Sequence, residues 1–133
     1  MIVGVIDASA AVEYLLRTEL GESITPLIES ATLIAPELLD VEVLAVLRCE
    51  VAHGRLRKQR AAEALEDLID WDVERLSHRT LVEAAWALRD RVTAYDALYV
   101  AAAQLRGAML ITADGPLSRA PALGVVVHNV RLA

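Results

Sequence analysis

Short apolar runs alternate along this chain with longer segments whose apolar residues recur at helical spacing. Most of the runs are rich in Val, Ile and Leu and are bounded by an acidic residue, a proline or a turn, which is typical of buried strands. They predict strands at Ile2–Ile6, Thr32–Ala35, Val73–Leu76, Ala108–Thr112 and Val125–His128.

The segments between these runs predict helices, and proline or glycine marks several of their ends. Pro36 precedes one helix that Gly54 follows, and Gly107 ends another. Pro26 has to lie in the first turn of its helix, because a proline deeper in a helix removes a backbone hydrogen bond. The predicted helices are Ser9–Arg17, Ser23–Ser30, Glu37–His53, Gln59–Trp71, Arg79–Val92 and Thr93–Arg106, with a short irregular helix after the turn at Ala113–Pro116.

Strands that alternate with helices indicate right-handed crossovers and parallel strand pairing. We therefore expect an α/β protein, a three-layer α/β/α sandwich with a central, mainly parallel sheet of four or five strands. No linker, repeat or low-complexity segment divides the sequence. Residues 1–133 are expected to form a single domain.

Hydrophobic residues make up 56% of the chain, which contains no Phe. The excess of Ala, Val and Leu suits helices packed closely on a sheet, and it leaves apolar surface for a homo-oligomer or another protein partner. The single Cys49 excludes an internal disulfide and a Cys-based zinc site. The N-terminal residues lack the basic region of a signal peptide, and no uncharged apolar stretch reaches the ~18 residues of a membrane span. We expect a soluble, cytoplasmic protein.

The net charge of −6 argues against a protein that grips nucleic acid over its whole surface. It does not exclude a nuclease with a local carboxylate cluster, because a bound cation reverses the local field. Basic residues do gather in one stretch, at Arg48, Arg55, Arg57, Lys58 and Arg60. This stretch is interpreted either as a solvated turn between helices or as a contact with the phosphate backbone of a nucleic acid.

Asp96 lies in the first turn of a predicted helix that is apolar on every side, so the helix should be enclosed by the rest of the protein. An ionised carboxylate at such a position needs a partner. Thr93 and Asp96 fit a capping box, in which both side chains bind free backbone N–H groups. Alternatively, Asp96 faces a cation that it shares with other carboxylates.

Two further carboxylates follow predicted strands, where ligand sites of open parallel sheets lie. Asp7 ends the first strand, and Asp114 comes two residues after the fourth. Each also has a local explanation. Asp7 can cap the helix that follows it, and Asp114 with Gly115 is an ordinary turn pair.

Glu42 is the fourth acidic residue of interest. On a helical wheel it falls among Leu38, Ala45, Val46 and Cys49, away from both ends of its helix. We therefore expect it to be buried, where a carboxylate is either paired with a basic side chain such as Arg48 or bound to a metal.

Together, Asp7, Glu42, Asp96 and Asp114 indicate a shared cation, because clustered like charges repel one another unless a cation lies between them. Oxygen ligands without Cys or a paired His motif favour Mg²⁺ or Mn²⁺. Such an ion activates a water and neutralises charge on a phosphoryl group. The four residues thus predict metal-dependent phosphoryl chemistry.

Four segments of the chain resemble the PIN domain. They are V-I-D-A-S-A at Val5–Ala10, L-L-D-V-E-V-L-A-V-L at Leu38–Leu47, T-A-Y-D-A-L-Y-V-A-A-A at Thr93–Ala103 and L-I-T-A-D at Leu110–Asp114. Their order and content are most similar to the VapC-type toxins of toxin–antitoxin systems. The resemblance implies an Mg²⁺- or Mn²⁺-dependent endoribonuclease that forms a homodimer and is inhibited by a VapB-type antitoxin.

By this resemblance, the four acidic residues would bind the metal and catalyse hydrolysis, leaving 3′-hydroxyl and 5′-phosphate ends. Ser9 and Thr112 would support them by hydrogen bonding to carboxylates or to metal-bound water. Ala45 stands where such proteins often carry Asn or another polar residue, which puts one supporting contact in doubt. No motif identifies the RNA that is cut.

Other small doubly wound folds fit less well. A phosphoacceptor receiver domain needs a lysine beside its acidic pocket, and the only lysine, Lys58, falls between two helices. A haloacid-dehalogenase-like phosphatase needs an aspartate two residues after Asp7, where this chain has Ser9. The surroundings of the histidines do not indicate Ser-His-Asp chemistry. The remaining alternative is a non-catalytic PIN-fold module that acts through protein contacts.

Overall fold

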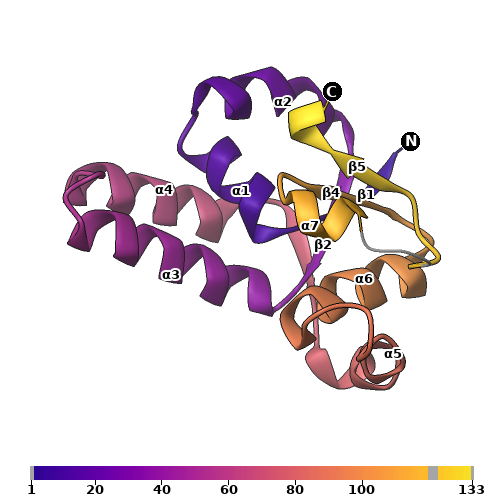
Figure 1. Cartoon of the computed structure of the whole chain (residues 1–133). Helices are drawn as coiled ribbons and strands as arrows, with labels where there is room; N and C mark the ends of the chain where they lie inside the picture. Colours follow the sequence, from indigo (N-terminus) through magenta and orange to yellow (C-terminus); the bar gives the residue numbers. More distant parts are fainter. Residues whose placement is uncertain (1, 120–122, 133) are drawn as a thin grey trace.

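The computed structural model describes residues 2–119 and 123–132, and five parallel strands form its central sheet (Figure 1). The strands are β1 Val3–Ile6, β2 Thr32–Pro36, β3 Val73–Leu76, β4 Met109–Thr112 and β5 Val127–Asn129. Their order across the sheet is β3-β2-β1-β4-β5. Val5 of the central strand is in register with Ile34 of β2 on one side and Leu110 of β4 on the other.

Helices cover both faces of this sheet. They are α1 Ala8–Leu15, α2 Glu19–Ser30, α3 Leu38–Ala52, α4 Lys58–Asp70, α5 Val82–Ala87, α6 Ala94–Arg106 and the short α7 Gly115–Arg119, with 3₁₀ turns η1 at His78–Thr80 and η2 at Val130–Leu132. From β1 to β3 the chain moves outward in one direction, and through α5 and α6 it returns to β4. Right-handed crossovers therefore place α1–α4 and α5–α6 on opposite faces. The predicted α/β/α sandwich is confirmed.

Helix α6 lies against the middle of the sheet, where it contacts β1, β2 and β4. All residues from Tyr99 to Ala103 are buried. Thr93 caps the start of the helix, and Gly107 ends it in a left-handed conformation with φ 60°. The expected enclosure of this apolar helix is confirmed, and its small alanine side chains allow the helix to pack closely on the strands.

The helix pair α3–α4 extends away from the sheet (Figure 1). The inner side of α3 carries the buried Leu39, Val43 and Leu47. Several apolar side chains on its other sides are exposed, among them Val41 at 60% and Leu44 at 52%. This helix therefore has more apolar surface than the core of one chain covers.

The predicted bounds of α2 were wrong. This helix starts at Glu19, four residues earlier than expected, because the Thr18 hydroxyl accepts a hydrogen bond from the Gly21 N–H at 3.0 Å and caps it. Pro26 consequently lies inside the helix rather than in its first turn. The missing N–H would have bonded the Glu22 carbonyl. Both residues are exposed, so water can hydrogen-bond that carbonyl instead.

The helix predicted over Arg79–Val92 was also wrong in extent, since it is broken into η1 and the six-residue α5. After Ala87 the chain continues in tight turns, such as Arg91 N–H donating to the Leu88 carbonyl at 2.9 Å. Leu81 and Leu88 are the two fully buried residues of this segment, Ala84, Ala85 and Val92 are partly buried against the core, and Val82 and Trp86 are exposed. A segment that buries so little apolar area gains little from a longer helix.

The last strand, β5, begins two residues later than predicted, and the remaining predicted bounds agree with the structure to within two residues. None of the helices in the described part of the chain has the length and apolar character that crossing a membrane requires.

Candidate active site

The candidate site lies where β1 and β4 end side by side. The Asp7 N–H donates to the Ile111 carbonyl at 3.1 Å, which continues the pairing of the two strands to their carboxyl ends. Asp7 is 5% exposed and caps α1, since its Oδ1 accepts a hydrogen bond from the Ala10 N–H at 3.1 Å. The cap that the sequence suggested is therefore real, and it uses one of the two carboxylate oxygens.

Two hydroxyl groups connect the start of α1 to the loop after β4. Ser9 Oγ donates to Asp7 Oδ1 at 2.6 Å and accepts from the Ala113 N–H at 2.9 Å. Thr112 Oγ1 lies 3.3 Å from Ser9 Oγ and accepts from the Asp114 N–H at 2.9 Å. Through these contacts the backbone of Asp114 is fixed beside Asp7.

Burial raises the pKa of Asp7 from 3.8 to about 6. Hydrogen bonds from Ser9, Thr112 and the Ala10 N–H lower this pKa, and the nearby charge of Asp114 raises it further. The fold therefore keeps an aspartate at a position where its charged form is disfavoured, which is more typical of functional groups than of simple helix caps.

Asp96 is half-buried at the start of α6. Its own N–H donates to Thr93 Oγ1 at 3.2 Å, so Thr93 provides the side-chain cap of the helix. Burial raises the pKa of the Asp96 carboxyl, and the charges of Asp114 and Glu42 raise it further, while a hydrogen bond with Thr93 lowers it. Three acidic side chains from separate segments therefore interact at this point.

Glu42 lies on α3 at the border of the core and is only partly buried. The prediction that Glu42 is buried was wrong, because its helix neighbours Ala45, Val46 and Cys49 are exposed in the structure. Glu42 makes no salt bridge with Arg48 or with any other basic side chain in the described residues.

The partner of Glu42 is a residue for which the sequence suggested no function. The Tyr99 hydroxyl donates to Glu42 Oε1 at 2.7 Å, and Tyr99 is 1% exposed. Burial and this hydrogen bond raise the pKa of Tyr99, and the charge of Asp7 also contributes. Tyr99 follows Asp96 by three residues, so both lie on the same side of α6. This three-residue spacing, visible in the segment Y-D-A-L-Y, is the feature of the sequence that could have identified Tyr99 as a site residue.

The four acidic residues form a chain of electrostatic neighbours rather than a finished metal site. Asp114 acts on both Asp7 and Asp96, and Glu42 acts on Asp96. As they stand, no three Asp, Glu, His or Cys side chains within residues 2–119 and 123–132 are close enough together to hold a metal ion. Side-chain rotation is needed to bring several carboxylates onto one ion.

The chemistry of the donor set nevertheless suits a hard divalent cation. All four side chains end in oxygen ligands, and no salt bridge in the described part of the chain neutralises any of them.

The predicted basic stretch is divided between internal contacts and exposed positions. Arg55 forms two hydrogen bonds with Glu50, at 2.9 and 3.0 Å. Arg60 donates to the Leu15 carbonyl at 2.7 Å and lies 3.5 Å from a Glu63 oxygen. These two arginines serve structural contacts within the chain.

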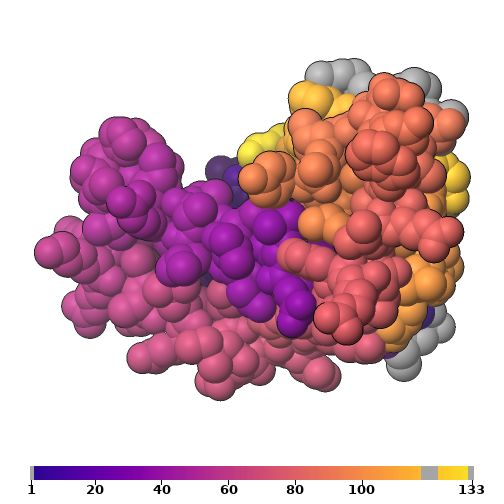
Figure 2. Space-filling model, turned by 90° about the horizontal axis from the view of Figure 1, so that it is seen from below, coloured from indigo at the N-terminus to yellow at the C-terminus, as the bar shows by residue number. Residues whose placement is uncertain are grey.

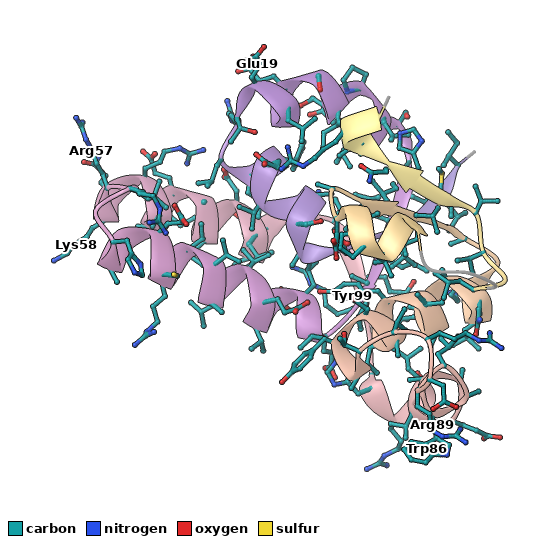
Figure 3. All side chains as sticks on the ribbon, viewed as in Figure 1. Glu19, Arg57, Lys58, Trp86, Arg89 and Tyr99 are labelled. Carbon is teal, nitrogen blue, oxygen red and sulfur yellow. The ribbon has the colours of Figure 1, made fainter. Side chains whose placement is uncertain are left out.

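The other three residues, Arg48, Arg57 and Lys58, are exposed. Arg57 and Lys58 lie at the outer end of the α3–α4 pair, far from Tyr99 (Figure 3). A contact of this stretch with RNA remains a prediction, and it would involve nucleotides distant from the acidic residues.

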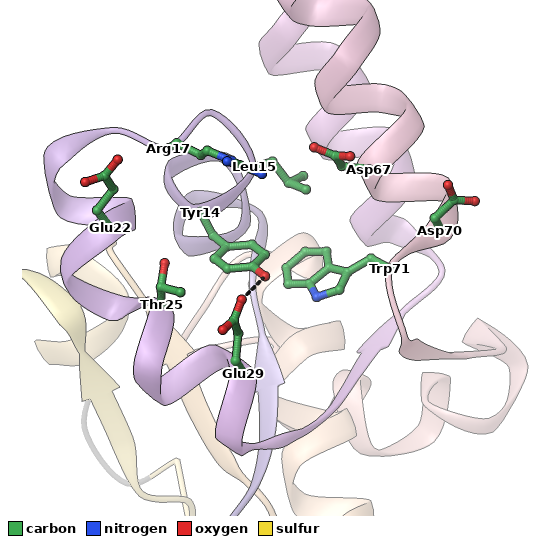
Figure 4. A pocket seen from close by; sticks show the side chains of 9 residues that line it. All are labelled: Tyr14, Leu15, Arg17, Glu22, Thr25, Glu29, Asp67, Asp70 and Trp71. Carbon is green, nitrogen blue, oxygen red and sulfur yellow. Dashed lines mark hydrogen bonds between the residues drawn. The ribbon is translucent and has the colours of Figure 1, made fainter.

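Two pockets flank the region. One, of about 430 Å³, includes Asp96 and the loop between α5 and α6. The other, of about 580 Å³, lies between α1, α2 and the end of α4, where the Tyr14 and Trp71 rings stack with centroids 4.9 Å apart (Figure 4). Acidic side chains of Glu22, Glu29, Asp67 and Asp70 line this second pocket, which contains none of the predicted site residues.

Comparison with known sequences finds a match to the family model for the PIN domain over residues 4–123. Ribonuclease VapC1 of Mycobacterium tuberculosis is 38% identical over 137 residues, which cover 96% of this chain and 97% of that protein. Ribonuclease VapC12 of the same species is 33% identical over 115 residues, covering 86% of this chain and 89% of that protein.

Comparison with solved structures finds the same fold in several chains, among them those of the following two proteins. PAE2754 from Pyrobaculum aerophilum has a TM-score of 0.71 at 22% identity, covering 98% of this chain and 86% of that chain. VapBC2 from Rickettsia felis, solved with a DNA fragment from its promoter, has a TM-score of 0.60 at 15% identity, covering 96% of this chain and 98% of that chain. At these identities the likeness concerns the fold alone.

Proposed function

This chain belongs to the PIN-domain family, and we propose that it is a VapC-type toxin, a metal-dependent endoribonuclease that hydrolyses phosphodiester bonds of RNA. The observation that carries the proposal is the meeting of Asp7, Glu42, Asp96 and Asp114 from four separate segments in one electrostatically coupled group. The ribonuclease names of its relatives support the substrate class.

In this proposal the four carboxylates hold Mg²⁺ or Mn²⁺. When bound, such an ion supplies an activated water and neutralises charge on the phosphoryl group. The rest of the site orients the carboxylates. Ser9 and the Ala10 N–H hold Asp7 through Oδ1, and in this proposal the cation binds at Oδ2. Thr112 fixes the backbone of Asp114 in the same way.

Tyr99 is proposed as the positioning residue for Glu42. The phenol keeps its proton at neutral pH, as an ordinary tyrosine does, and its O–H donates a hydrogen bond to Glu42 Oε1. Glu42 Oε2 is then available to a cation. A partly buried glutamate on a helix has several accessible rotamers, and this hydrogen bond selects one of them.

Two partners follow from the proposed function. The VapC-type relatives suggest inhibition by a VapB-type antitoxin. The exposed Val41, Leu44 and Val46 on one helix support a homodimer, since apolar side chains at neighbouring positions favour a protein contact. An activity on cellular RNA also implies a cytoplasmic protein.

The proposal is tested by cleavage of structured RNAs by the wild-type, Asp96→Asn and Glu42→Gln proteins, each with Mg²⁺ and with EDTA. Asp72→Asn and Glu66→Gln are matched controls, since both side chains are exposed and outside the acidic group. We expect cleavage only with Mg²⁺ and only by the wild type and the controls. Each site variant should lose at least about 100-fold in rate, or about 3 kcal/mol of transition-state stabilisation.

Equal cleavage by all proteins in both conditions would exclude the metal mechanism. No cleavage by any protein would favour the non-catalytic binding module. Circular dichroism separates a chemical effect from a folding effect. A Glu42→Gln protein that fails to fold would mean that Glu42 is a structural residue and not a ligand.

A further inference from the structure

The loop between α5 and α6 brings basic side chains into the same pocket as Asp96. This pocket has a volume of about 430 Å³, and it is lined by Arg89, Asp90, Arg91, Val92, Thr93, Asp96, Pro116 and Leu117. It therefore connects a candidate metal ligand with two guanidinium groups. A polyanion bound in this pocket at Asp96 would lie near these arginines.

Arg89 is held in place by Trp86, one turn earlier in the chain. Its Cζ lies 4.7 Å from the centroid of the Trp86 ring, and its Nη1 donates to the Trp86 carbonyl at 3.1 Å. The indole ring is 67% exposed. Both side chains project from the end of α5 away from the sheet (Figure 3).

Together the exposed tryptophan and the stacked arginine present an aromatic face and a cation at one place on the surface. In the view of Figure 2, residues 80–95 form the salmon and orange part of the surface beside the start of α3. Trp86 belongs to this part of the chain, which also includes the pocket residues Arg89 and Arg91.

We propose that Trp86 and Arg89 form a subsite for single-stranded RNA next to the scissile phosphate. Arg89 contacts a backbone phosphate, and the indole of Trp86 stacks on an unpaired base. The inference rests on the proposed ribonuclease function and adds the residues that select unpaired RNA. Aromatic stacking and guanidinium contacts are how proteins bind single strands, whereas a duplex keeps its bases stacked on one another.

The pocket contains charges of both signs, so the subsite predicts that neutralising an aspartate and neutralising an arginine change RNA affinity in opposite directions. Arg89 and Arg91 attract phosphates, while Asp90 and Asp96 repel them. Removing the charge of Asp90 should therefore tighten RNA binding, and removing that of Arg89 should weaken it. A purely structural role of the loop would not produce opposite effects from adjacent residues.

Steady-state cleavage of a single-stranded RNA in Mg²⁺ measures the effect on binding. Trp86→Ala and Arg89→Ala should each raise KM by on the order of tenfold, the range of one base stack or one phosphate contact, with kcat nearly unchanged. Trp86→Phe should keep most of the affinity, and Asp90→Asn should lower KM. Trp71→Phe is the control, because it removes an indole that stacks on Tyr14 and lies outside the proposed subsite.

A spectroscopic measurement follows the ring itself. The chain has two tryptophans, so Trp71→Phe leaves Trp86 as the only indole. Rapid mixing with single-stranded RNA in Mg²⁺ should quench its fluorescence before any cleavage, and duplex RNA of the same sequence should quench it less. This signal reports binding even if no RNA is cut.

The outcomes separate the two proposals. Cleavage without any change in KM for Trp86→Ala, and without quenching, would overturn the subsite and leave the ribonuclease intact. Quenching without cleavage by the wild type would support the subsite and contradict the proposed catalysis. If Trp86→Ala instead dissociates a dimer in sedimentation and binds RNA as before, the patch is a protein contact and the RNA subsite is wrong.

Discussion

Asp7 is both a helix cap and a member of the acidic group, and its two oxygens allow both functions. One oxygen accepts hydrogen bonds from Ser9 and the Ala10 N–H, while the side chain as a whole is 5% exposed. The local explanation from the sequence and the functional one are therefore compatible. The same holds at Asp96, where Thr93 supplies the cap of α6.

The raised pKa of Asp7 predicts how stability changes with pH. Its value is 3.8 in the unfolded reference and about 6 in the folded protein. The folded state therefore binds more protons between these two values, so the free energy of unfolding falls as pH rises from about 4 to about 6 and then levels off. At neutral pH the charged Asp7 costs about 3 kcal/mol of stability.

We expect Asp7→Asn to remove this cost while keeping the cap, since Asn accepts the same backbone hydrogen bond. In EDTA at pH 7.5 the variant should be more stable than the wild type by about 1–3 kcal/mol, and the difference should disappear toward pH 4. Urea unfolding at several pH values measures this. A constant difference across this pH range would mean that Asp7 does not titrate as described.

The matched control is Asp72→Asn, at an exposed position outside the acidic group. It should change the free energy of unfolding by less than about 0.5 kcal/mol at every pH. Addition of Mg²⁺ should then stabilise the wild type and the control but not Asp7→Asn, because only the first two keep all four carboxylates.

The site residues that could be predicted from the sequence are those that directly follow predicted strands. Asp7 and Asp114 follow β1 and β4, so their meeting is expected once parallel strands are recognised. Tyr99 was missed because its partner Glu42 is 57 residues away. The environment of Glu42 was misjudged because a helical wheel treats apolar residues as buried, whereas α3 exposes Val46 and its neighbours.

At the scale of elements, α1 and α2 approach each other more closely than any pattern in the sequence reveals. Gly21 in the first turn of α2 lies against the backbone of Glu13 in α1, and a Cβ on Gly21 would overlap the Glu13 carbonyl. This contact allows α2 to start early and contributes to the wrong prediction for Pro26. The packing of α1 in turn positions Asp7 and Ser9.

We expect Gly21→Ala to lower the free energy of unfolding by at least about 2 kcal/mol, since backbone atoms cannot move aside as a flexible side chain can. Gly54→Ala is the contrasting variant. A Cβ there meets nothing within 4 Å, but φ is 72°, so only backbone strain of about 1 kcal/mol applies.

Chemical denaturation of both proteins measures the difference between them. An equal and small loss for Gly21→Ala and Gly54→Ala would contradict the close contact between α1 and α2.

Over the whole molecule, the order β3-β2-β1-β4-β5 creates the site, because it places β1 next to β4 although more than a hundred residues separate Val3 from Met109. Alternating strands and helices predicted the layers. The order depends on pairings between distant strands, and neither the pattern nor the resemblance was used to predict it. The segment at η1 and α5 is broken because it buries little apolar area, and the local pattern does not reveal this.

The central claim is that four acidic residues from α1's cap, α3, α6 and the loop after β4 form one divalent-metal site. Its most direct test is X-ray diffraction at the manganese absorption edge from crystals grown with Mn²⁺. We predict an anomalous peak coordinated by at least three of the carboxylates of Asp7, Glu42, Asp96 and Asp114. Manganese bound only elsewhere, or no peak among these side chains at saturating Mn²⁺, would contradict the account.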